Sequence, residues 1–255
     1  MTQTQKCALI TGAASGIGFA AATRFAAEGY ALVLTDRNME GLEASAQALP
    51  ASTRVQLRPG EVTDPNVASD CVARAAAQFG GVDVLVTSAG IVKVAPSLDV
   101  SPDEFKAHMD VNVTGTWLFA QAVARDIVRR GGTGSIVMIG SVYGASGAPN
   151  RAAYCASKGA VHNLTESLAV EWGPLGIRVN AVAPTGVRTP MVQALIDAGS
   201  YNTTGVRART PLGRLAEPDE VAAACWFLAS DQAAMITGVV LPVDGGWLAN
   251  GYTVS

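Results

Sequence analysis

A tyrosine and a lysine stand four residues apart in RAAYCASKGAVHNLTESLAVEW, a stretch whose apolar spacing predicts a helix. Side chains at i and i+4 project from one helix face, so Tyr154 and Lys158 are expected to lie side by side. An ammonium group beside a phenol favours the phenolate and lowers the phenol's pKa from its usual value of about 10. The pair could therefore act as an acid and base near neutral pH, although an isolated pair is more often an ordinary tyrosine beside a solvated lysine.

A glycine-rich turn, TGAASGIG, follows the first short apolar run and opens a helical pattern. Glycines let such a turn tighten and let its backbone approach a pyrophosphate, which the N–H groups of the helix N-terminus then hold. On its own the turn is a weak signal. Its candidate cofactor contacts are Gly12, Ser15, Gly16, Ile17 and Gly18.

An acidic residue, Asp36, ends the second apolar run at a distance from the glycines that suits a carboxylate accepting both hydroxyls of a ribose. A 2′-phosphate would meet like-charge repulsion there, and Ala14 offers no basic side chain to offset it. The sequence therefore predicts NAD as the cofactor. Arg37 follows the acid directly and leaves weak use of NADP open.

Short β-rich apolar runs alternate with longer helical patterns along the chain, which is typical of βαβ units. We predict an α/β fold with a Rossmann-type, doubly wound, seven-stranded parallel sheet flanked by helices on both faces. One domain is expected over residues 1–255, because no linker or low-complexity stretch divides the chain. Strands are expected at 7–11, 31–36, 54–58, 82–88, 135–141, 178–183 and 239–244. Helices are expected near 17–28, 39–49, 65–79, 103–130, 152–172 and 218–229.

Two segments depart from this regular alternation. Pro59 and Gly60 interrupt the third strand, which is therefore expected to be an edge strand that ends early. Residues 189–212 are rich in Gly, Ser, Asn and Thr and are expected to be irregular. Such a segment is expected to form a lid or substrate loop, with a mobile surface loop as an equal alternative.

The composition of the chain limits the classes of partner that it is expected to bind. The 255-residue chain has a formal net charge of −3 and no long Lys/Arg run, which disfavours nucleic acid and membrane surfaces as partners. Its first apolar run is too short for a signal peptide or a membrane span, so a cytoplasmic location is expected. The cysteines lack metal-site spacing, so they are expected to be reduced and near the core, with no bound metal. They are Cys7, Cys71, Cys155 and Cys225.

With these motifs in place, the chain resembles the short-chain dehydrogenase/reductase family, in the branch with TGxxxGIG and YxxxK, over essentially its whole length. The resemblance implies hydride transfer between NAD and a secondary alcohol or ketone, with Tyr154 as the acid and base. It implies that Ser141, thirteen residues before Tyr154, holds the substrate oxygen. Asn112 in MDVNVTG would anchor a water in a proton relay through Lys158, which would also bind the nicotinamide ribose.

The resemblance implies further cofactor contacts. Pro184 would shape a turn beside nicotinamide, Val187 would offer its backbone to the carboxamide, and Thr189 would reach a phosphate. The remaining implied contacts are Glu61 and Val62 near adenine, and Ala89 and Gly90 after the fourth strand. The chain departs from the family pattern at Thr87–Ser88, where two asparagines are usual, at Glu61, where aspartate is usual, and at Thr185, where glycine is usual.

The sequence says less about the identity of the substrate than about the reaction and the cofactor. Polar residues in the variable segments favour a sugar, a polyol or another small hydroxylated substrate such as a hydroxy acid, although each could equally lie on the surface. They are Lys93, Tyr143, Ser146, Asn150, Asn202 and Arg207. A reductase similar to the 3-oxoacyl-(acyl-carrier-protein) reductases is the first alternative, and a non-catalytic dinucleotide sensor or scaffold is the second. The resemblance also implies a homotetramer, to which an apolar tail at 247–254 could contribute.

Overall fold

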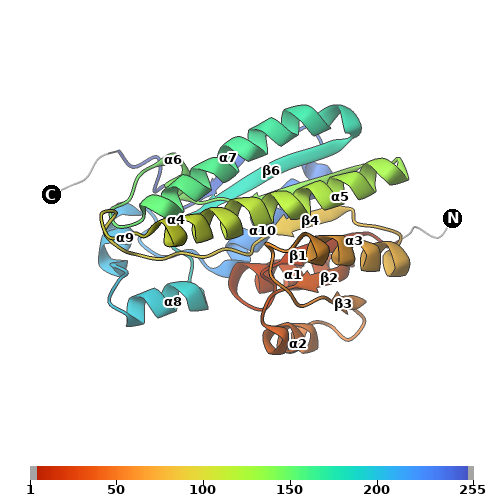
Figure 1. Cartoon of the computed structure of the whole chain (residues 1–255), viewed down its shortest axis with the longest axis horizontal. Coiled ribbons are helices and arrows are strands. Elements are labelled where there is room, and N and C mark those ends of the chain that lie inside the picture. The colour runs from red at the N-terminus through yellow and green to blue at the C-terminus, as the bar shows by residue number, and fades with distance from the viewer. Residues whose placement is uncertain (1–4, 252–255) are drawn as a thin grey trace.

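Seven parallel strands form one sheet in the order β3-β2-β1-β4-β5-β6-β7 (Figure 1). The structure is a computed structural model that describes residues 5–251, so the end of the predicted 247–254 tail lies outside the described residues. The predicted sheet is confirmed, and β3 is a short edge strand that ends before Pro59, as expected. The strands are β1 (Cys7–Thr11), β2 (Ala31–Thr35), β3 (Val55–Leu57), β4 (Val84–Thr87), β5 (Gly134–Ile139), β6 (Ile177–Pro184) and β7 (Val240–Val243).

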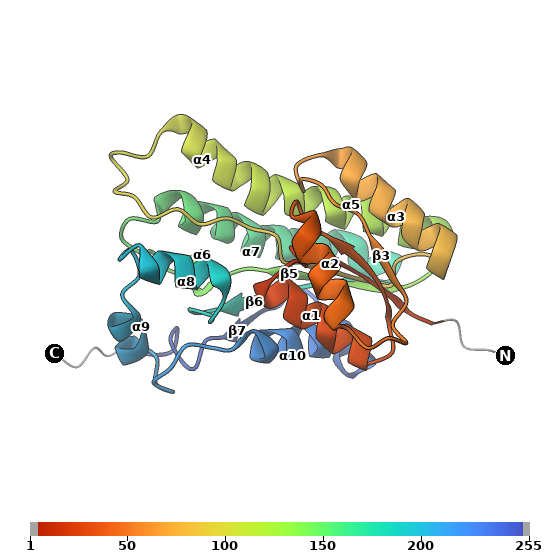
Figure 2. The same ribbon diagram turned by 90° about the horizontal axis from the view of Figure 1, so that it is seen from below.

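Helices cover both faces of the sheet, as Figure 2 shows from below. Alternate side chains of each central strand enter opposite cores: Cys7 and Leu9 pack in one, and Ala8 and Ile10 in the other. A strand buried on both faces needs a nearly continuous apolar run, which explains the CALIT pattern of β1. One face carries α3 (Pro65–Phe79), α5 (Thr116–Arg130) and α7 (Ala152–Trp172), and the other α1 (Gly16–Ala27), α2 (Met39–Ala48) and α10 (Pro218–Ala229).

The helix predicted at 103–130 is interrupted. The structure has α4 (Pro102–Met109), then a π-helical stretch η1 (Asp110–Gly115), and then α5. A π-helical turn adds a residue to the helical turn and redirects the side chains beside it, and such turns are frequent at functional sites. Asn112 lies within η1, so this irregularity sets the direction of its side chain.

The segment predicted to be irregular at 189–212 contains two helices, which corrects that prediction. They are α8 (Pro190–Asp197) and α9 (Thr203–Arg209). Thr189 caps α8 by accepting from the Val192 N–H, and Asn202 caps α9 by accepting from the Gly205 N–H. Cap residues and turn residues are the same types, so a segment rich in Thr, Asn and Gly can hold short helices.

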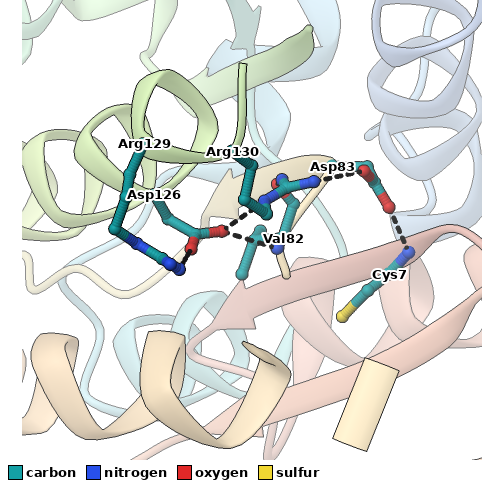
Figure 3. Close-up of polar contacts among 6 residues, drawn as sticks. All are labelled: Cys7, Val82, Asp83, Asp126, Arg129 and Arg130. Carbon is teal, nitrogen blue, oxygen red and sulfur yellow. Dashed lines mark hydrogen bonds and ion pairs between the residues drawn. The ribbon is translucent and has the colours of Figure 1, made fainter. Parts of the chain in front are cut away.

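At the amino ends of the central strands, buried polar contacts join three elements (Figure 3). Asp83, just before β4, accepts from the Cys7 N–H at 2.8 Å, and Asp126 of α5 accepts from the Val82 N–H at 3.1 Å. Asp126 is 3% exposed and also pairs with Arg129 and Arg130. These contacts fix the end of the sheet where β1 and β4 begin.

Other sequence expectations concern the cysteines and the membrane. Cys7, Cys71 and Cys225 are buried free thiols, and Cys155 is a half-buried free thiol, which agrees with the expected position in or near the core. Within residues 5–251, no helix combines the length and apolar character that crossing a bilayer would require.

Candidate active site

A cavity of about 320 Å³ lies at the carboxyl ends of the parallel strands. Its wall includes the residue that directly follows each of five strands, which is where ligands bind in open α/β sheets. Those residues are Gly12, Asp36, Ser88, Gly140 and Thr185. The cavity brings together every predicted cofactor contact except Gly18, and also Ser141. Sequence motifs scattered over most of the chain therefore meet in one place.

The glycine-rich turn between β1 and α1 makes two close approaches that only glycine allows. Gly12 has φ +66°, and a Cβ there would lie 2.7 Å from the Ala89 nitrogen. A Cβ on Gly18 would lie 2.1 Å from the Gly12 oxygen, so Gly18 seats α1 against the turn rather than lining the cavity. Ser15 precedes α1 without capping it through its side chain. The first N–H groups of α1 thus remain suited to a phosphate group, which fits a dinucleotide.

Asp36 is held in a fixed orientation at the adenosine side of the predicted site. Its Oδ2 accepts from the Ala14 N–H at 3.3 Å, and its Oδ1 accepts from the Asn38 N–H at 3.0 Å. Each carboxylate oxygen has a further lone pair that can accept from a ribose hydroxyl. Arg37 also lines the cavity but is exposed. The carboxylate therefore fits an unphosphorylated ribose better than a 2′-phosphate.

Ser141, Tyr154 and Lys158 lie together at one end of the cavity. Ser141 follows β5 and begins the short helix α6 (Val142–Ala145), where its Oγ accepts from the Tyr143 N–H at 3.2 Å. The Ser141 side chain lies near enough to the Tyr154 phenol to lower its pKa. One helical turn further along α7, the Lys158 Nζ lies 5.7 Å from the centre of the Tyr154 ring. The expected side-by-side placement is therefore present.

The pKa of Tyr154 departs from the sequence expectation. Tyr154 keeps part of its surface in the cavity, but burial raises the pKa of its phenol to about 12, and the Ser141 hydroxyl offsets this only in part. Burial also lowers the pKa of Lys158 to about 8. The Lys158 amine donates to the Ile139 carbonyl at 2.7 Å. Desolvation thus outweighs the two groups that lower the phenol's pKa, the Ser141 hydroxyl and the Arg151 guanidinium, so the expected lowering of this pKa is wrong here.

Asn112 lies behind the cavity wall, fully buried, with both ends of its amide bonded to protein. Its Oδ1 accepts from the Ile91 N–H at 2.8 Å, and its Nδ2 donates to the Ile91 carbonyl and the Ser157 hydroxyl at 3.0 and 2.9 Å. A Cβ on Gly90 would lie 3.2 Å from Asn112 Oδ1 and 3.8 Å from Lys158 Nζ. Asn112 thus joins the segment after β4 to α7 beside Lys158, and its relay role stays a prediction.

The other predicted cofactor residues lie around the same wall. Pro184 ends β6, and Val187 forms an isolated bridge with Ala216. Thr189 packs its methyl group near Gly16, while its hydroxyl caps α8. These contacts place the start of the 189–212 segment against the glycine-rich turn. Further residues that the sequence analysis did not predict also line the cavity. They include Ile91, Val111, Ile139, Pro190, Met191 and Val192.

Five of the six polar substrate candidates make contacts within the protein. Lys93 pairs with Glu104, Ser146 donates to Val142, Arg207 donates to Gly213, Asn202 caps α9, and the Asn150 carbonyl accepts from the Ala95 N–H. Tyr143 differs, because its ring meets the Tyr154 ring edge to face at a centroid distance of 6.5 Å. Tyr143 also contacts Trp247 at 5.5 Å. Tyr143 is thus the candidate closest to the predicted acid and base.

Two residues beside Tyr143, Arg151 and Tyr201, were not identified as site residues from the sequence. The Arg151 guanidinium lies 5.8 Å from the Tyr143 ring centre and 6.0 Å from that of Tyr201. The available signal was that Arg151 stands directly before the helix that carries Tyr154. Tyr201 belongs to the segment between α8 and α9, and only the fold brings it to this place.

Comparisons with known proteins cover nearly the whole chain. A family model described as enoyl-(acyl carrier protein) reductase matches residues 12–248. The D-threitol dehydrogenase of Mycolicibacterium smegmatis is 40% identical over 246 residues, which make up 95% of this chain and 92% of that protein. The cis-4-hydroxycyclohexanecarboxylate dehydrogenase of Sinomonas cyclohexanicum is 42% identical over 247 residues, 96% of this chain and 97% of that protein.

The fold has close counterparts among solved structures. One of them, described as ElxO with NADP bound, matches with a TM-score of 0.88 and 32% sequence identity. The match covers 96% of this chain and 99% of that chain. The similarity therefore extends over the sheet, both helical layers and the cavity.

Proposed function

We propose that this chain, which belongs to the short-chain dehydrogenase/reductase family, oxidises a small secondary alcohol with NAD. Membership makes it an oxidoreductase that acts on CH–OH groups. The observation that carries the proposal is the meeting of Ser141, Tyr154 and Lys158 in the wall of a cavity that the glycine-rich turn and Asp36 also line. When bound there, the nicotinamide group would supply the carbon that accepts the hydride.

In this proposal, three side chains handle the proton and the substrate oxygen. The Ser141 hydroxyl holds the alcohol oxygen, and the Tyr154 phenol takes the proton of the alcohol as it passes its own proton to the neutral amine of Lys158. Lys158, whose pKa is lowered to about 8, can exchange a proton at neutral pH and so lets the proton leave Tyr154. In the reverse direction, Tyr154 returns the proton to the carbonyl oxygen.

We infer a preference for NAD over NADP from Asp36. Its carboxylate lines the cavity and is fixed by two backbone N–H groups, so it cannot easily turn away from a 2′-phosphate. The family takes either dinucleotide, since a structural relative is described with NADP bound. Arg37 is the residue that could support NADP in this chain.

The relatives support a small hydroxylated substrate. One is named for D-threitol, an open-chain polyol, and another for a hydroxylated cyclohexanecarboxylate. We infer that the substrate of this chain is of similar size, in the range of sugars, polyols, cyclic alcohols and hydroxy acids. The expected homotetramer and cytoplasmic location stay predictions, and sedimentation velocity would test the first.

The experiment that tests the function is an initial-rate survey. NADH formation is followed with sugars, polyols, cyclic secondary alcohols and hydroxy acids, and 3-oxoacyl thioesters are offered in the reverse direction. Oxidation of at least one small alcohol with NAD is expected. If the protein binds NAD but turns over none of these compounds, the proposal fails and a dinucleotide sensor becomes the better account.

A further inference from the structure

Arg151 carries a positive charge beside the predicted acid and base. It stands one helical turn before Tyr154, and its guanidinium lies 5.8 and 6.0 Å from the centres of the Tyr143 and Tyr201 rings. The Tyr143 ring in turn meets the Tyr154 ring at 6.5 Å. The Tyr143 ring therefore links the guanidinium to Tyr154, although neither Tyr143 nor Arg151 is among the residues that line the cavity.

The backbone fixes the position of this arginine. Asn150, directly before it, has φ +61°, a left-handed conformation that asparagine tolerates better than most residues. The Asn150 carbonyl accepts from the Ala95 N–H at 2.9 Å, which ties this turn to the segment after β4. Arg151 then begins α7 as its N-terminal cap residue. A charge held this way is placed relative to Tyr154 by the rigid helix that both residues share.

The guanidinium is half-buried, yet it has no carboxylate partner in the described part of the chain. Six other arginines, including Arg58, Arg130 and Arg214, form ion pairs there, whereas Arg151 does not. Its described hydrogen bonds go to the Pro149 and Ser200 carbonyls at 3.3 and 3.4 Å. An arginine has five N–H donors in a planar fork that matches a carboxylate, so most of its donors remain available.

A second arginine lies on the same aromatic cluster. The Arg209 guanidinium stacks 3.7 Å above the Trp247 ring, and Trp247 contacts Tyr143. Arg209 likewise has no acidic partner within residues 5–251. The aromatic cluster that contacts Tyr154 therefore carries two positive charges without an acidic partner in the described part of the chain.

We propose that Arg151 binds a carboxylate of the substrate, so that the preferred substrates are hydroxy acids rather than neutral alcohols. The inference rests on the proposed alcohol oxidation and narrows it to one substrate class. The guanidinium lies near the Tyr143 and Tyr201 rings, and its free N–H groups would donate to the carboxylate. In this arrangement Arg151 contributes to binding and to selection, while Ser141 and Tyr154 act on the hydroxyl group.

The test uses pairs of compounds that differ only in charge. We would measure kcat and KM with NAD for cis-4-hydroxycyclohexanecarboxylate against its primary amide, and for D-gluconate against D-gluconamide. The variants are Arg151→Gln and Arg151→Lys, with Arg74→Gln as the matched control, since Arg74 is exposed on α3. Tyr154→Phe would report background turnover.

We expect the unaltered protein to favour the carboxylate of at least one pair. A charge-assisted hydrogen bond in a partly buried site corresponds to roughly a 10- to 100-fold change in KM. Arg151→Gln should remove that preference by raising KM for the carboxylate, Arg151→Lys should keep part of it, and Arg74→Gln should keep all of it. Equal kcat/KM for acid and amide in the unaltered protein would overturn the inference and leave the alcohol oxidation standing.

Two further outcomes separate the inference from its alternatives. If Arg151→Gln lowers kcat equally for acid and amide and shifts the pH profile, Arg151 acts on the ionisation of Tyr154, and the inference is wrong. If no alcohol is oxidised, calorimetric titration with cyclohexanecarboxylate and cyclohexanecarboxamide in the presence of NADH shows whether the protein still has the proposed anion site. Binding of the carboxylate alone, lost in Arg151→Gln, would support the anion site although the proposed activity fails, and no binding would overturn both.

Discussion

At the scale of single residues, burial displaces the pKa values of the predicted acid and base in opposite directions, away from each other. Burial raises the pKa of the Tyr154 phenol to about 12 and lowers the pKa of the Lys158 amine to about 8, so it shifts each group toward its neutral form. The sequence indicated the pair through its spacing, but spacing says nothing about the depth of a side chain. Desolvation depends on the layers packed around α7, which the whole fold determines.

We predict that Tyr154→Phe retains dinucleotide binding and loses turnover. The change removes only the hydroxyl, so the ring contact with Tyr143 persists while the group that moves the proton is lost. General acid and base groups contribute roughly 10²- to 10⁴-fold to rate, and a fall in kcat of that size is expected. NADH fluorescence titration and initial rates at pH 7 would measure the two effects.

Tyr30→Phe is the matched control, because Tyr30 is buried against Phe25 and does not line the cavity. It should leave both measurements close to those of the unaltered protein. Substantial alcohol oxidation by Tyr154→Phe at neutral pH would refute the assigned role.

We predict that Asp36→Ala raises the ratio of kcat/KM with NADP to that with NAD by about tenfold or more. The variant removes the carboxylate that repels a 2′-phosphate and leaves Arg37 to attract it. Glu40→Ala is the control, since Glu40 is exposed on α2 and removes the same charge outside the cavity lining. An unchanged ratio in Asp36→Ala would mean that another group selects the dinucleotide.

At the scale of elements, the strands and most helices could be predicted, because each has an apolar pattern of its own period. The π-helical stretch η1 could not, since one extra residue in a turn hardly alters the apolar pattern between α4 and α5. The helices α8 and α9 were also missed, although Thr189–Pro190 and Asn202 are ordinary signals for a helix start. Both misses lie beside the cavity, where local structure departs from regular patterns.

We predict that Asn112→Ala lowers the free energy of unfolding by about 2–4 kcal/mol, because it leaves several buried polar groups without a hydrogen-bond partner. The Ile91 N–H and carbonyl and the Ser157 hydroxyl would all lose a partner. Urea unfolding would measure the change, with Asn163→Ala on the exposed side of α7 as the control. If the unfolding free energy stays the same and only kcat falls, Asn112 has a relay role without this structural one.

We predict that His108 makes the protein less stable as pH falls from 7 to 5. Burial and nearby Lys93 lower the pKa of His108, whose Nε2 accepts from the Lys93 N–H at 3.1 Å. Because the folded pKa lies below the unfolded value of about 6.5, the stabilisation is complete above that value and is lost as pH falls below it. His108→Gln should therefore flatten the pH dependence of urea midpoints in this range.

Burial and Lys158 also lower the pKa of His162. Protonation of His162 therefore also reduces the stability of the protein as pH falls. Some pH dependence should therefore remain in His108→Gln. An equally steep decline between pH 7 and 5 in that variant and in the unaltered protein would contradict the role of His108.

At the scale of the whole molecule, the two ends of the sheet have different roles, one in binding and one in stability. The carboxyl ends of the strands carry the cavity, and the sequence predicted this end well because glycines and polar residues directly follow apolar runs. The amino ends carry the Asp126 contacts of Figure 3, which the sequence did not predict. A charged residue on an amphipathic helix looks solvated until the fold places another element over it.

The separation of the two ends predicts that stability and substrate binding can be changed independently. Asp126→Ala leaves the Arg130 guanidinium and the Val82 N–H without their buried partner, so a loss of about 3–5 kcal/mol in unfolding free energy is expected. KM for any alcohol substrate should stay the same at a temperature where the variant is folded, because none of these residues lines the cavity. Asp231→Ala, which removes an ion pair to Lys6 from a carboxylate 94% exposed, should change neither quantity appreciably. A KM that rises with the loss of stability in Asp126→Ala would instead mean that the contacts at the amino ends of the strands control the shape of the cavity.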